Sequence, residues 1–399
     1  MVPKIDSDIG IYVYSTAFEG VGGTIRSTFD GFFVSEVLDQ KSLSKISKGN
    51  GYPVYKLKKY GVDTTHALAE IFKIQGLRLK ALGLKDANAA TEQFVCSTTT
   101  SKSPEKFSTN RYTLEVIGYV PKPLTKKDMI GNHFKIKIHD SDFDKISSFR
   151  QYDKVLNFYG YQRFGTRRPV SHLIGKAILQ NDFERAVNLL LSYSTEHDLP
   201  ENTKVRKMLA DKSQYFEALR EMPPKMDLER LVLTEMTKSY DPFMAMRAVP
   251  LSIRRLFIQA FKSYVFNCCV SMSFENGEEL FSPKAGDVCY DNNNKLGKFE
   301  NDPKQRLAIP LVGYSYSKKN RFDYYITKIL QREQVRAKDF FVKAMQEVSD
   351  EGGFRQAVIK CESFSVDRPT VSFTLSRGSY ATILLREIMK PQDPITAGF

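Results

Sequence analysis

Three segments of this sequence carry residue types that could hold and transform a flat, polar ligand. Glycine lets a backbone approach a ligand closely, amide and charged side chains bind its polar edge, and aromatic rings stack on its face. A carboxylate among them could act as a nucleophile or as a proton acceptor. This mixture suits a binding site better than a hydrophobic core. The segments are Gly83–Gln93 (GLKDANAATEQ), Asn157–Pro169 (NFYGYQRFGTRRP) and Leu375–Glu387 (LSRGSYATILLRE).

Other familiar motifs fail on their spacing. Gly20–Gly23 hints at a phosphate-binding loop, but Ile25 stands at the third glycine position and no GK[ST] follows. The alternation in Asp140–Asp144 is typical of a calcium loop, but Lys145 occupies the glycine position, which favours an acidic helix start. The five cysteines and five histidines form no CxxC, HxxxH or HExxH pattern. The sequence therefore predicts neither a metal site nor a disulfide framework.

The spacing of apolar residues divides the chain into β-rich ends and a helical middle. Alternation predicts strands, and a period near 3.6 residues predicts helices. Asp63 or Thr64 can cap one early helix, and Gly76 lies where that helix would stop. Strands are predicted at 31–37, 52–60, 111–120, 133–139, 370–375 and 380–387, a hairpin at 286–299, and helices at 64–74, 172–192, 204–210, 214–221, 253–270, 322–334 and 337–347.

This pattern predicts one sheet domain that is interrupted by an inserted, helix-rich domain. A chain of 399 residues is long enough for two domains. We place the first part of the sheet domain at 1–166, the inserted domain at 167–349 and the second part of the sheet domain at 350–399.

The charge of the chain favours a polyanionic partner. Lys and Arg number 59 against 46 Asp and Glu, which gives a formal net charge of +13. The start MVPKIDSDIG has no apolar core after a basic end, so no signal peptide is predicted. No run approaches the roughly 18 apolar residues of a membrane span. We therefore expect a cytoplasmic protein, or a nuclear one in a eukaryote.

Together, the three segments resemble the motifs of the TruD family of tRNA pseudouridine synthases. GLKDANAATEQ is similar to the family's G-x-K-D-x-x-A-x-T-x-Q motif, NFYGYQRFG to N-[YF]-[FY]-G-x-Q-R-F-G, and GSYATILLRE to G-S-[FY]-A-T-x-x-[LV]-R-E. GTRRPVSHLIGKAIL resembles the archaeal and eukaryotic branch in particular. The resemblance covers about residues 20–390, and weaker matches keep the same order at Ile25–Arg26, Phe33–Glu36, Gly131–Phe134 and Ala285–Val288.

The resemblance implies an α+β fold and an isomerase. The fold would be a mixed, mainly antiparallel pseudouridine-synthase sheet domain with an inserted, helix-rich α/β TRUD domain. The reaction would convert uridine to pseudouridine in tRNA, usually at position 13 of the D-arm, without redox cofactor, ATP or metal. Asp86 matches the family's catalytic aspartate, whereas taken alone it is better explained as a turn residue or helix cap.

The resemblance also implies substrate-binding residues around Asp86. A uracil that leaves its stack needs an aromatic platform, and Tyr159 and Tyr380 occupy the family's aromatic positions. Arg26 matches a basic residue, often lysine, that lies near the catalytic aspartate in the family. The other expected residues are Asn157 at a uracil edge or at the Asp86 loop, Glu36 and Gln93 as supports, and Lys85 as a phosphate contact.

Clusters of basic residues predict where RNA phosphates would bind. A run of positive charge is often only a solvated surface. A cluster that lies near a nucleotide pocket is a better candidate for binding phosphates. The clusters are Lys56, Lys58 and Lys59 on one predicted strand, Lys122, Lys126 and Lys127 on a loop, Arg163, Arg167 and Arg168 in the second segment, and Arg254–Arg255 on a helix that could clamp RNA from the other side.

Other functions stay open on the sequence alone. A non-catalytic RNA-binding protein or tRNA-folding chaperone would share the pocket, although a binder does not need Asp86. A synthase could also act on other structured RNAs. Metal-dependent nuclease action is disfavoured because the sequence has no convincing carboxylate or histidine cluster. No obligate protein partner is inferred.

Overall fold

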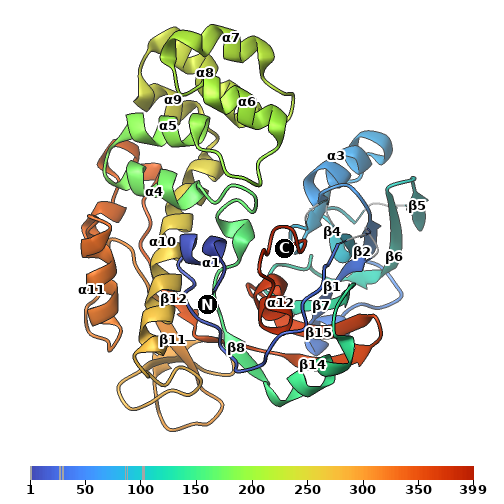
Figure 1. The fold of residues 1–399 in the computed structure, drawn as a ribbon. Coiled ribbons are helices and arrows are strands. Elements are labelled where there is room, and N and C mark those ends of the chain that lie inside the picture. The colour runs from blue at the N-terminus through green and yellow to red at the C-terminus, as the bar shows by residue number, and fades with distance from the viewer. Residues whose placement is uncertain (1, 27, 29–30, 86, 88, 101–103) are drawn as a thin grey trace.

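The computed structural model describes residues 2–26, 28, 31–85, 87, 89–100 and 104–399. A sheet lobe and a helical lobe stand side by side, with helix α12 (Ala381–Met389) between them (Figure 1). The sheet lobe takes its strands from both ends of the sequence, and the helical lobe comes from the middle. The predicted domain boundaries remain our proposal for the units of the chain.

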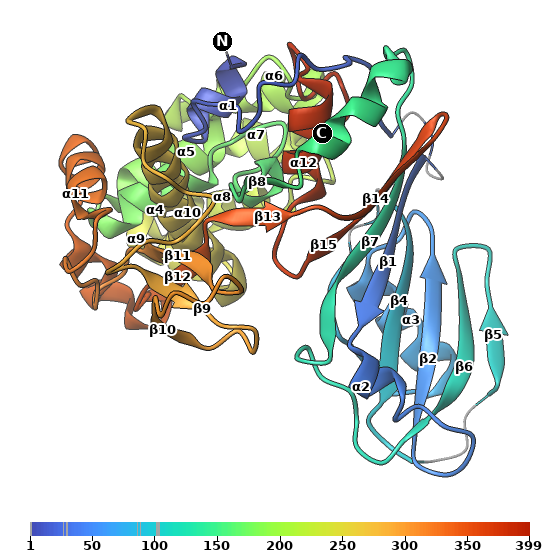
Figure 2. The same ribbon diagram turned by 90° about the horizontal axis from the view of Figure 1, so that it is seen from below.

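Nine strands of the described residues form one mixed sheet (Figure 2). Its order is β14–β15–β7–β1–β4–β2–β6–β5, with β3 paired to β4. β1 and β4 run parallel and the other pairs run antiparallel, which confirms the predicted fold class. The strands are β1 (Phe32–Leu38), β2 (Tyr52–Lys59), β3 (Leu79–Ala81), β4 (Ala90–Ser97), β5 (Lys106–Ser108), β6 (Tyr112–Val120), β7 (Met129–Lys137), β14 (Glu362–Asp367) and β15 (Thr370–Ser376).

Helix α3 (Thr64–Gln75) covers part of one face of this sheet, as its sequence predicts. The Asp63 carboxylate caps the helix by accepting the backbone N–H groups of Thr65 and His66, at 2.9 and 3.1 Å. Gly76 ends it in the left-handed conformation, with φ 67°. Ala67 and Ile71 of the helix pack in one buried cluster with side chains from β2, β4 and β6.

The helical lobe is built around α10, whose side chains are buried on most of its faces. The predicted helix at 172–192 is two helices, because Asn181 adopts a left-handed conformation and Asp182 caps a new helix through Arg185 N–H at 3.0 Å. The α-helices of this lobe are α4 (Ser171–Leu179), α5 (Phe183–Ser192), α6 (Pro200–Met208), α7 (Tyr215–Glu221), α8 (Asp227–Ser239), α9 (Pro242–Ala248), α10 (Leu251–Glu275) and α11 (Asp323–Arg332).

Short elements complete the chain. The predicted helix at 337–347 consists of two 3-10 helices, η5 (Ala337–Phe340) and η6 (Lys343–Val348). The predicted hairpin at 286–299 is confirmed as β9 and β10. The remaining elements are α1 (Lys4–Asp8), α2 (Gln40–Leu43), η2 (Phe143–Gln151), η3 (Tyr161–Arg163), η4 (Lys212–Gln214), the sheet of β10 (Leu296–Lys298), β9 (Val288–Tyr290), β11 (Arg306–Leu311) and β12 (Gly353–Gln356), and the pair β13 (Val358–Lys360) and β8 (Lys154–Leu156).

The strand predicted at 380–387 is wrong, because these residues form helix α12. Its residues 381–389 are all buried. Their apolar side chains recur at helical spacing, for example at Leu384, Leu385 and Ile388, so the segment's own pattern favours a helix over the predicted strand. Tyr380 has an extended backbone and precedes the first turn of the helix. No described helix combines the length and apolarity that a membrane crossing requires.

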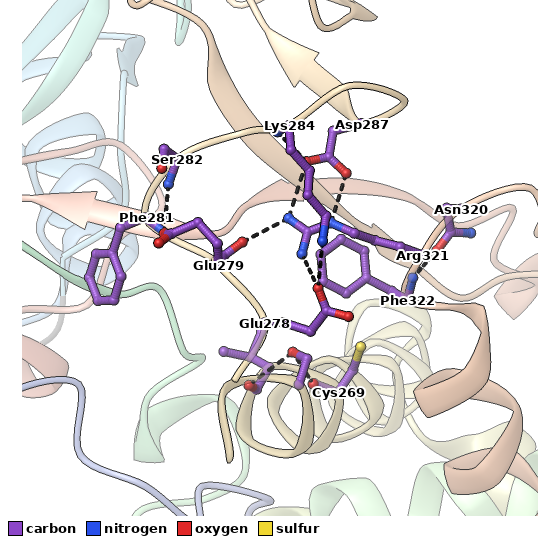
Figure 3. A network of polar contacts seen from close by, with 12 residues as sticks. Cys269, Glu278, Glu279, Phe281, Ser282, Lys284, Asp287, Asn320, Arg321 and Phe322 are labelled. Atoms are coloured by element: carbon purple, nitrogen blue, oxygen red, sulfur yellow. Dashed lines mark hydrogen bonds and ion pairs between the residues drawn. The ribbon is translucent and has the colours of Figure 1, made fainter. Parts of the chain in front are cut away.

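The weak motif Ala285–Val288 has a structural role in the helical lobe (Figure 3). The Asp287 carboxylate accepts two hydrogen bonds from the Arg321 guanidinium, at 2.8 and 3.1 Å. Arg321 also donates to the Glu278 carboxylate at 2.5 Å and to the Glu279 carbonyl at 2.8 Å. The network therefore fixes the segment after α10 against the start of α11.

Candidate active site

A cavity of about 1100 Å³ lies where the sheet lobe meets the start of α12, and all three motif segments reach it. Its floor is apolar and comes from Phe32, Val34 and Phe134 on adjacent strands β1 and β7. The motif residues on its wall are Leu84, Lys85, Ala89 and Thr91 from the first segment, Gln162, Thr166 and Arg167 from the second, and Ser379, Tyr380, Ala381 and Thr382 from the third.

Among the residues that the structure describes, all charged side chains on the cavity wall are basic. The charged residues among its lining are Arg26, Lys85 and Arg167. Neutral polar groups from Asn132, Gln162 and other residues line the same cavity. A cavity with basic groups, hydrogen-bonding side chains and an apolar floor suits a nucleotide, whose phosphate, base edge and base face need these three kinds of contact.

Lys85 is held by an ion pair. Its Nζ lies 2.9 Å from Glu36 Oε1, and the Glu36 side chain is fully buried. The other carboxylate oxygen of Glu36 accepts the backbone N–H of Phe94 at 2.9 Å. Lys85 is thus paired inside the protein at the cavity wall, and its predicted phosphate contact would require it to share its charge with Glu36.

The loop before Asp86 is tied down by three further side chains. Gln93 is fully buried, donates to the Gly83 carbonyl at 3.2 Å and accepts from the Thr64 hydroxyl at 2.8 Å. The same Thr64 hydroxyl accepts the Lys85 backbone N–H at 2.9 Å, and Lys59 Nζ donates to the Lys85 carbonyl at 3.2 Å. Asp86 itself lies outside the described residues.

The two tyrosines that we predicted to stack on uracil lie one behind the other. Tyr380 lines the cavity, whereas Tyr159 is 8% exposed and is not among the lining residues. Their ring centroids are 6.1 Å apart in an edge-to-face arrangement. Between the two, Gly160 allows the close approach, because a Cβ there would lie 2.9 Å from the Tyr380 ring. Tyr159 therefore supports Tyr380 from behind in this structure.

Arg355 joins the second and third segments, and sequence reasoning missed it. Its guanidinium lies 4.0 Å from the centre of the Tyr159 ring and donates to Asn157 Oδ1 at 2.6 Å, to the Asn157 carbonyl at 3.0 Å and to the Gly378 carbonyl at 3.1 Å. Burial lowers its pKa. The Asn157 amide also donates to the Gln356 carbonyl at 2.9 Å, so both ends of the amide are used within the framework. Arg355 lies outside every motif, so only the folded chain reveals this contact.

Lys56 and Lys58, which we predicted to contact RNA beside the pocket, lie on the opposite face of the sheet. Thr91 lines the cavity, so Glu92, the next residue on β4, points to the other side. Lys56 and Lys58 pair with Glu92 at 2.7 and 3.3 Å. Lys59, the next residue, is fully buried. The strand's period of two therefore places Lys56 and Lys58 on the face away from the cavity, whereas Lys59 lies on the cavity face and holds the loop before Asp86.

The arginines of the second segment have different surroundings. Arg167 is exposed and lines the cavity. Arg163 stands 5.4 Å from the centre of the Tyr159 ring. Arg168 is used inside the protein, because it pairs with Glu229 at 3.0 Å and donates to the carbonyls of Leu190 and Tyr193. Burial and the neighbouring Arg206 lower the pKa of Arg168 to about 10. Because these contacts use its guanidinium inside the protein, we no longer predict that Arg168 binds an RNA phosphate.

Arg254 and Arg255 on α10, which we expected to clamp RNA, are also engaged in contacts within the protein. Arg254 is buried, pairs with Glu347 at 2.6 Å and donates to the Val249 carbonyl at 2.9 Å. Arg255 is exposed, but its Nε donates to the Glu347 carbonyl at 2.9 Å. These contacts hold η6 against α10, so Arg254 cannot clamp RNA as predicted. Within the described ranges, no group of three or more His, Cys, Asp or Glu side chains is placed to hold a metal ion.

Comparisons with known proteins identify the family of this chain. The family model for tRNA pseudouridine synthase D (TruD) matches residues 8–388. A probable tRNA pseudouridine synthase D from Saccharolobus solfataricus is 31% identical over 402 residues, which cover 97% of each chain. Another from Pyrobaculum islandicum is 30% identical over 419 residues, which cover 100% of this chain and 99% of the relative.

A solved structure shows the same architecture. The crystal structure of the putative tRNA pseudouridine synthase D from Methanosarcina mazei matches with a TM-score of 0.79 and 25% identity, over 99% of both chains. The fold and the motif-lined cavity therefore define a pseudouridine synthase. Because the family model spans almost the whole sequence, the chain belongs to the TruD family of tRNA pseudouridine synthases, which confirms the resemblance.

Proposed function

We propose that this protein converts uridine to pseudouridine in tRNA, and that the reaction takes place in the cavity between the sheet lobe and α12. One observation carries the proposal: the three family motifs, far apart in the sequence, line one cavity whose described charged side chains are all basic. A basic cavity of this kind suits a polyanionic RNA from which one base is turned out of its stack.

The reaction is an isomerisation within one nucleotide. The bond between uracil N1 and ribose C1′ breaks, and a bond between uracil C5 and C1′ forms. The hydrogen on C5 leaves as a proton and N1 takes up a proton, so atoms and electrons balance without a redox partner. A carboxylate nucleophile can hold the ribose or the base while the uracil turns. Asp86 is the residue we assign to this step, and Lys85 before it lines the cavity.

The neighbouring side chains take supporting roles in this proposal. The Arg26 cation favours an ionised carboxylate in the cavity, and Tyr380 offers its ring to the uracil face. The amides of Asn132 and Gln162 can both donate to and accept from the uracil edge. Glu36 and Gln93 keep the loop before Asp86 in place through the contacts described above.

The RNA phosphates would follow basic groups at the rim of this cavity. Arg167 is at the wall, and Arg377 of the third segment donates to the Lys126 carbonyl, which brings the exposed Lys126 and Lys127 beside this segment. These contacts are to the backbone of the RNA, so shape and an unstacked uridine would dominate recognition. We assign the D-arm uridine at position 13 as the target and the cytoplasm as the compartment.

Mapping the product in tRNA tests this proposal. An unmodified tRNA transcript is incubated with the protein without metal or ATP, and pseudouridine is located by carbodiimide labelling and reverse transcription. We expect one stop, at position 13, and none in a matched transcript with cytidine there. A stop elsewhere would contradict the assigned position. No stop in any tRNA of a total pool that the protein binds would instead favour a tRNA-folding chaperone.

A further inference from the structure

Residues 392–399 follow α12 and lie beyond the part of the chain that the family model matches, yet they form one wall of the cavity. Ile395, Thr396, Gly398 and Phe399 line the cavity directly. The segment folds on itself, because the Asp393 carboxylate accepts the backbone N–H of Ile395 at 3.0 Å and the Thr396 hydroxyl at 2.5 Å. It is therefore an ordered part of the site.

This segment is fastened to both sides of the cavity. On the sheet side, Ile25 N–H donates to the Ala397 carbonyl at 2.9 Å. On the side of the second motif, the Phe399 ring is buried and stands edge-to-face with Tyr161, with ring centroids 5.9 Å apart. Asp393 also lies 3.7 Å from the His197 imidazole of the helical lobe. The segment thus spans the gap between the two lobes.

Arg26 is in direct contact with this segment. Its Nη1 donates to the Gly398 carbonyl at 3.1 Å, and its guanidinium lies 4.4 Å from the centre of the Phe32 ring. The Arg26 backbone has φ 60°, a conformation that residues other than glycine seldom adopt and that surrounding contacts must hold. Gly398 is the point of closest approach, because a Cβ there would lie 2.1 Å from the Ile25 carbonyl oxygen.

We infer that residues 393–399 are a positioning element that aims the Arg26 guanidinium into the cavity through the Gly398 carbonyl. The inference rests on the proposed function, since Arg26 matters only if the cavity holds the reacting nucleotide. The segment touches the reaction only through Arg26 and the shape of the wall, and it supplies no reacting group.

The test is a double-mutant cycle with Gly398→Ala and Arg26→Ala, read as the single-turnover rate of tritium release from tRNA labelled at uracil C5. The methyl group at 398 must push the segment away from Ile25, so we expect Gly398→Ala to lower the rate about tenfold or more, while affinity for tRNA changes less than about threefold. In the Arg26→Ala background the same substitution should cost little further, because the two changes remove one interaction.

Gly277→Ala is the matched control for backbone strain. Gly277 has φ 76° and a Cβ there would meet nothing within 4 Å, whereas Gly398 has φ 92° and meets a carbonyl. Gly277→Ala should leave the rate unchanged, and thermal unfolding of each variant shows whether the fold is kept. An undiminished rate for Gly398→Ala, or an equal loss with and without Arg26, would overturn the inference. Absence of release by the unchanged protein would instead refute the proposed function.

Discussion

Replacing Arg386 by methionine is expected to cost about 3–5 kcal/mol of unfolding free energy, since it leaves buried carboxylates without their cation. Arg386, Asp6 and Glu387 have fully buried side chains, and Arg386 pairs with the two carboxylates at 2.6 and 3.3 Å. Burial alone would lower the pKa of Arg386, but the two carboxylates outweigh it and raise that pKa. Tyr161 completes the network by donating to Asp6 at 2.6 Å. The network ties α1, η3 and α12 together behind the cavity.

Urea unfolding, followed by the midpoint and the slope, measures this loss. The matched control is Arg368→Met, because Arg368 pairs with Asp144 at 3.3 Å while both side chains are largely exposed. An exposed pair of this kind contributes about 0–1 kcal/mol. Similar small effects for both variants would show that the Arg386 network is not needed for the stability of the fold.

Replacing Arg355 by methionine is expected to lower the rate of pseudouridine formation about 100-fold, because catalytic groups that lose their orientation by about 1 Å lose that much activity. The guanidinium connects Asn157 to Gly378, two residues before Tyr380, and lies on the Tyr159 ring. Without it, these oxygens lose their donors at a cost of about 1–3 kcal/mol. Tyr380 then loses both its support and the anchor of its turn.

Single-turnover kinetics on tRNA measure this effect, with Arg306→Met as control. Arg306 is on the adjacent strand β11, and it donates to the Asp291 carbonyl at 2.5 Å in a turn that does not line the cavity. Arg355→Lys keeps the charge but cannot form the forked contacts, so it should restore only part of the rate. Full activity of Arg355→Met would show that Tyr159 and the Gly378 turn hold their places without it.

Local signals in the sequence predict the elements that carry their own caps and periodicity. Helix α3 is such a case, since its Asp63 cap, apolar stripe and Gly76 stop all lie within the segment itself. Strand β2 is another, because its alternation between Tyr55 and Lys58 matches the buried and solvent-facing sides of the sheet. Helices α8 and α9 were not predicted, although Asp241 caps α9 through Phe243 N–H at 2.8 Å.

Tertiary context decides the cases where prediction fails. Residues 381–389 are the exception, because their helical spacing is present in the sequence although every one of them is buried. The face on which Lys56 and Lys58 lie depends on the register between β2 and β4, which pairs Lys58 with Glu92. Arg254 and Arg168 looked like surface cations, yet their partners Glu347 and Glu229 are about 60 or more residues away in sequence.

The candidate site, too, could be predicted from the sequence only in part. The three motifs predict which segments meet, and they do line one cavity. The layering of Tyr159 behind Tyr380, the Arg355 contact and the wall formed by residues 395–399 depend on packing between segments far apart in the chain. No local pattern of residues encodes these contacts.

The central claim, that Asp86 isomerises uridine in this cavity, is tested most directly by tritium release. tRNA transcripts labelled with tritium at uracil C5 are incubated with the unchanged protein and with Asp86→Asn, and tRNA binding is measured in parallel. We predict release into water by the unchanged protein and none by Asp86→Asn, although both bind tRNA. Equal release by both would remove Asp86 from its role, and no release by the unchanged protein from tRNA that it binds would contradict the synthase itself.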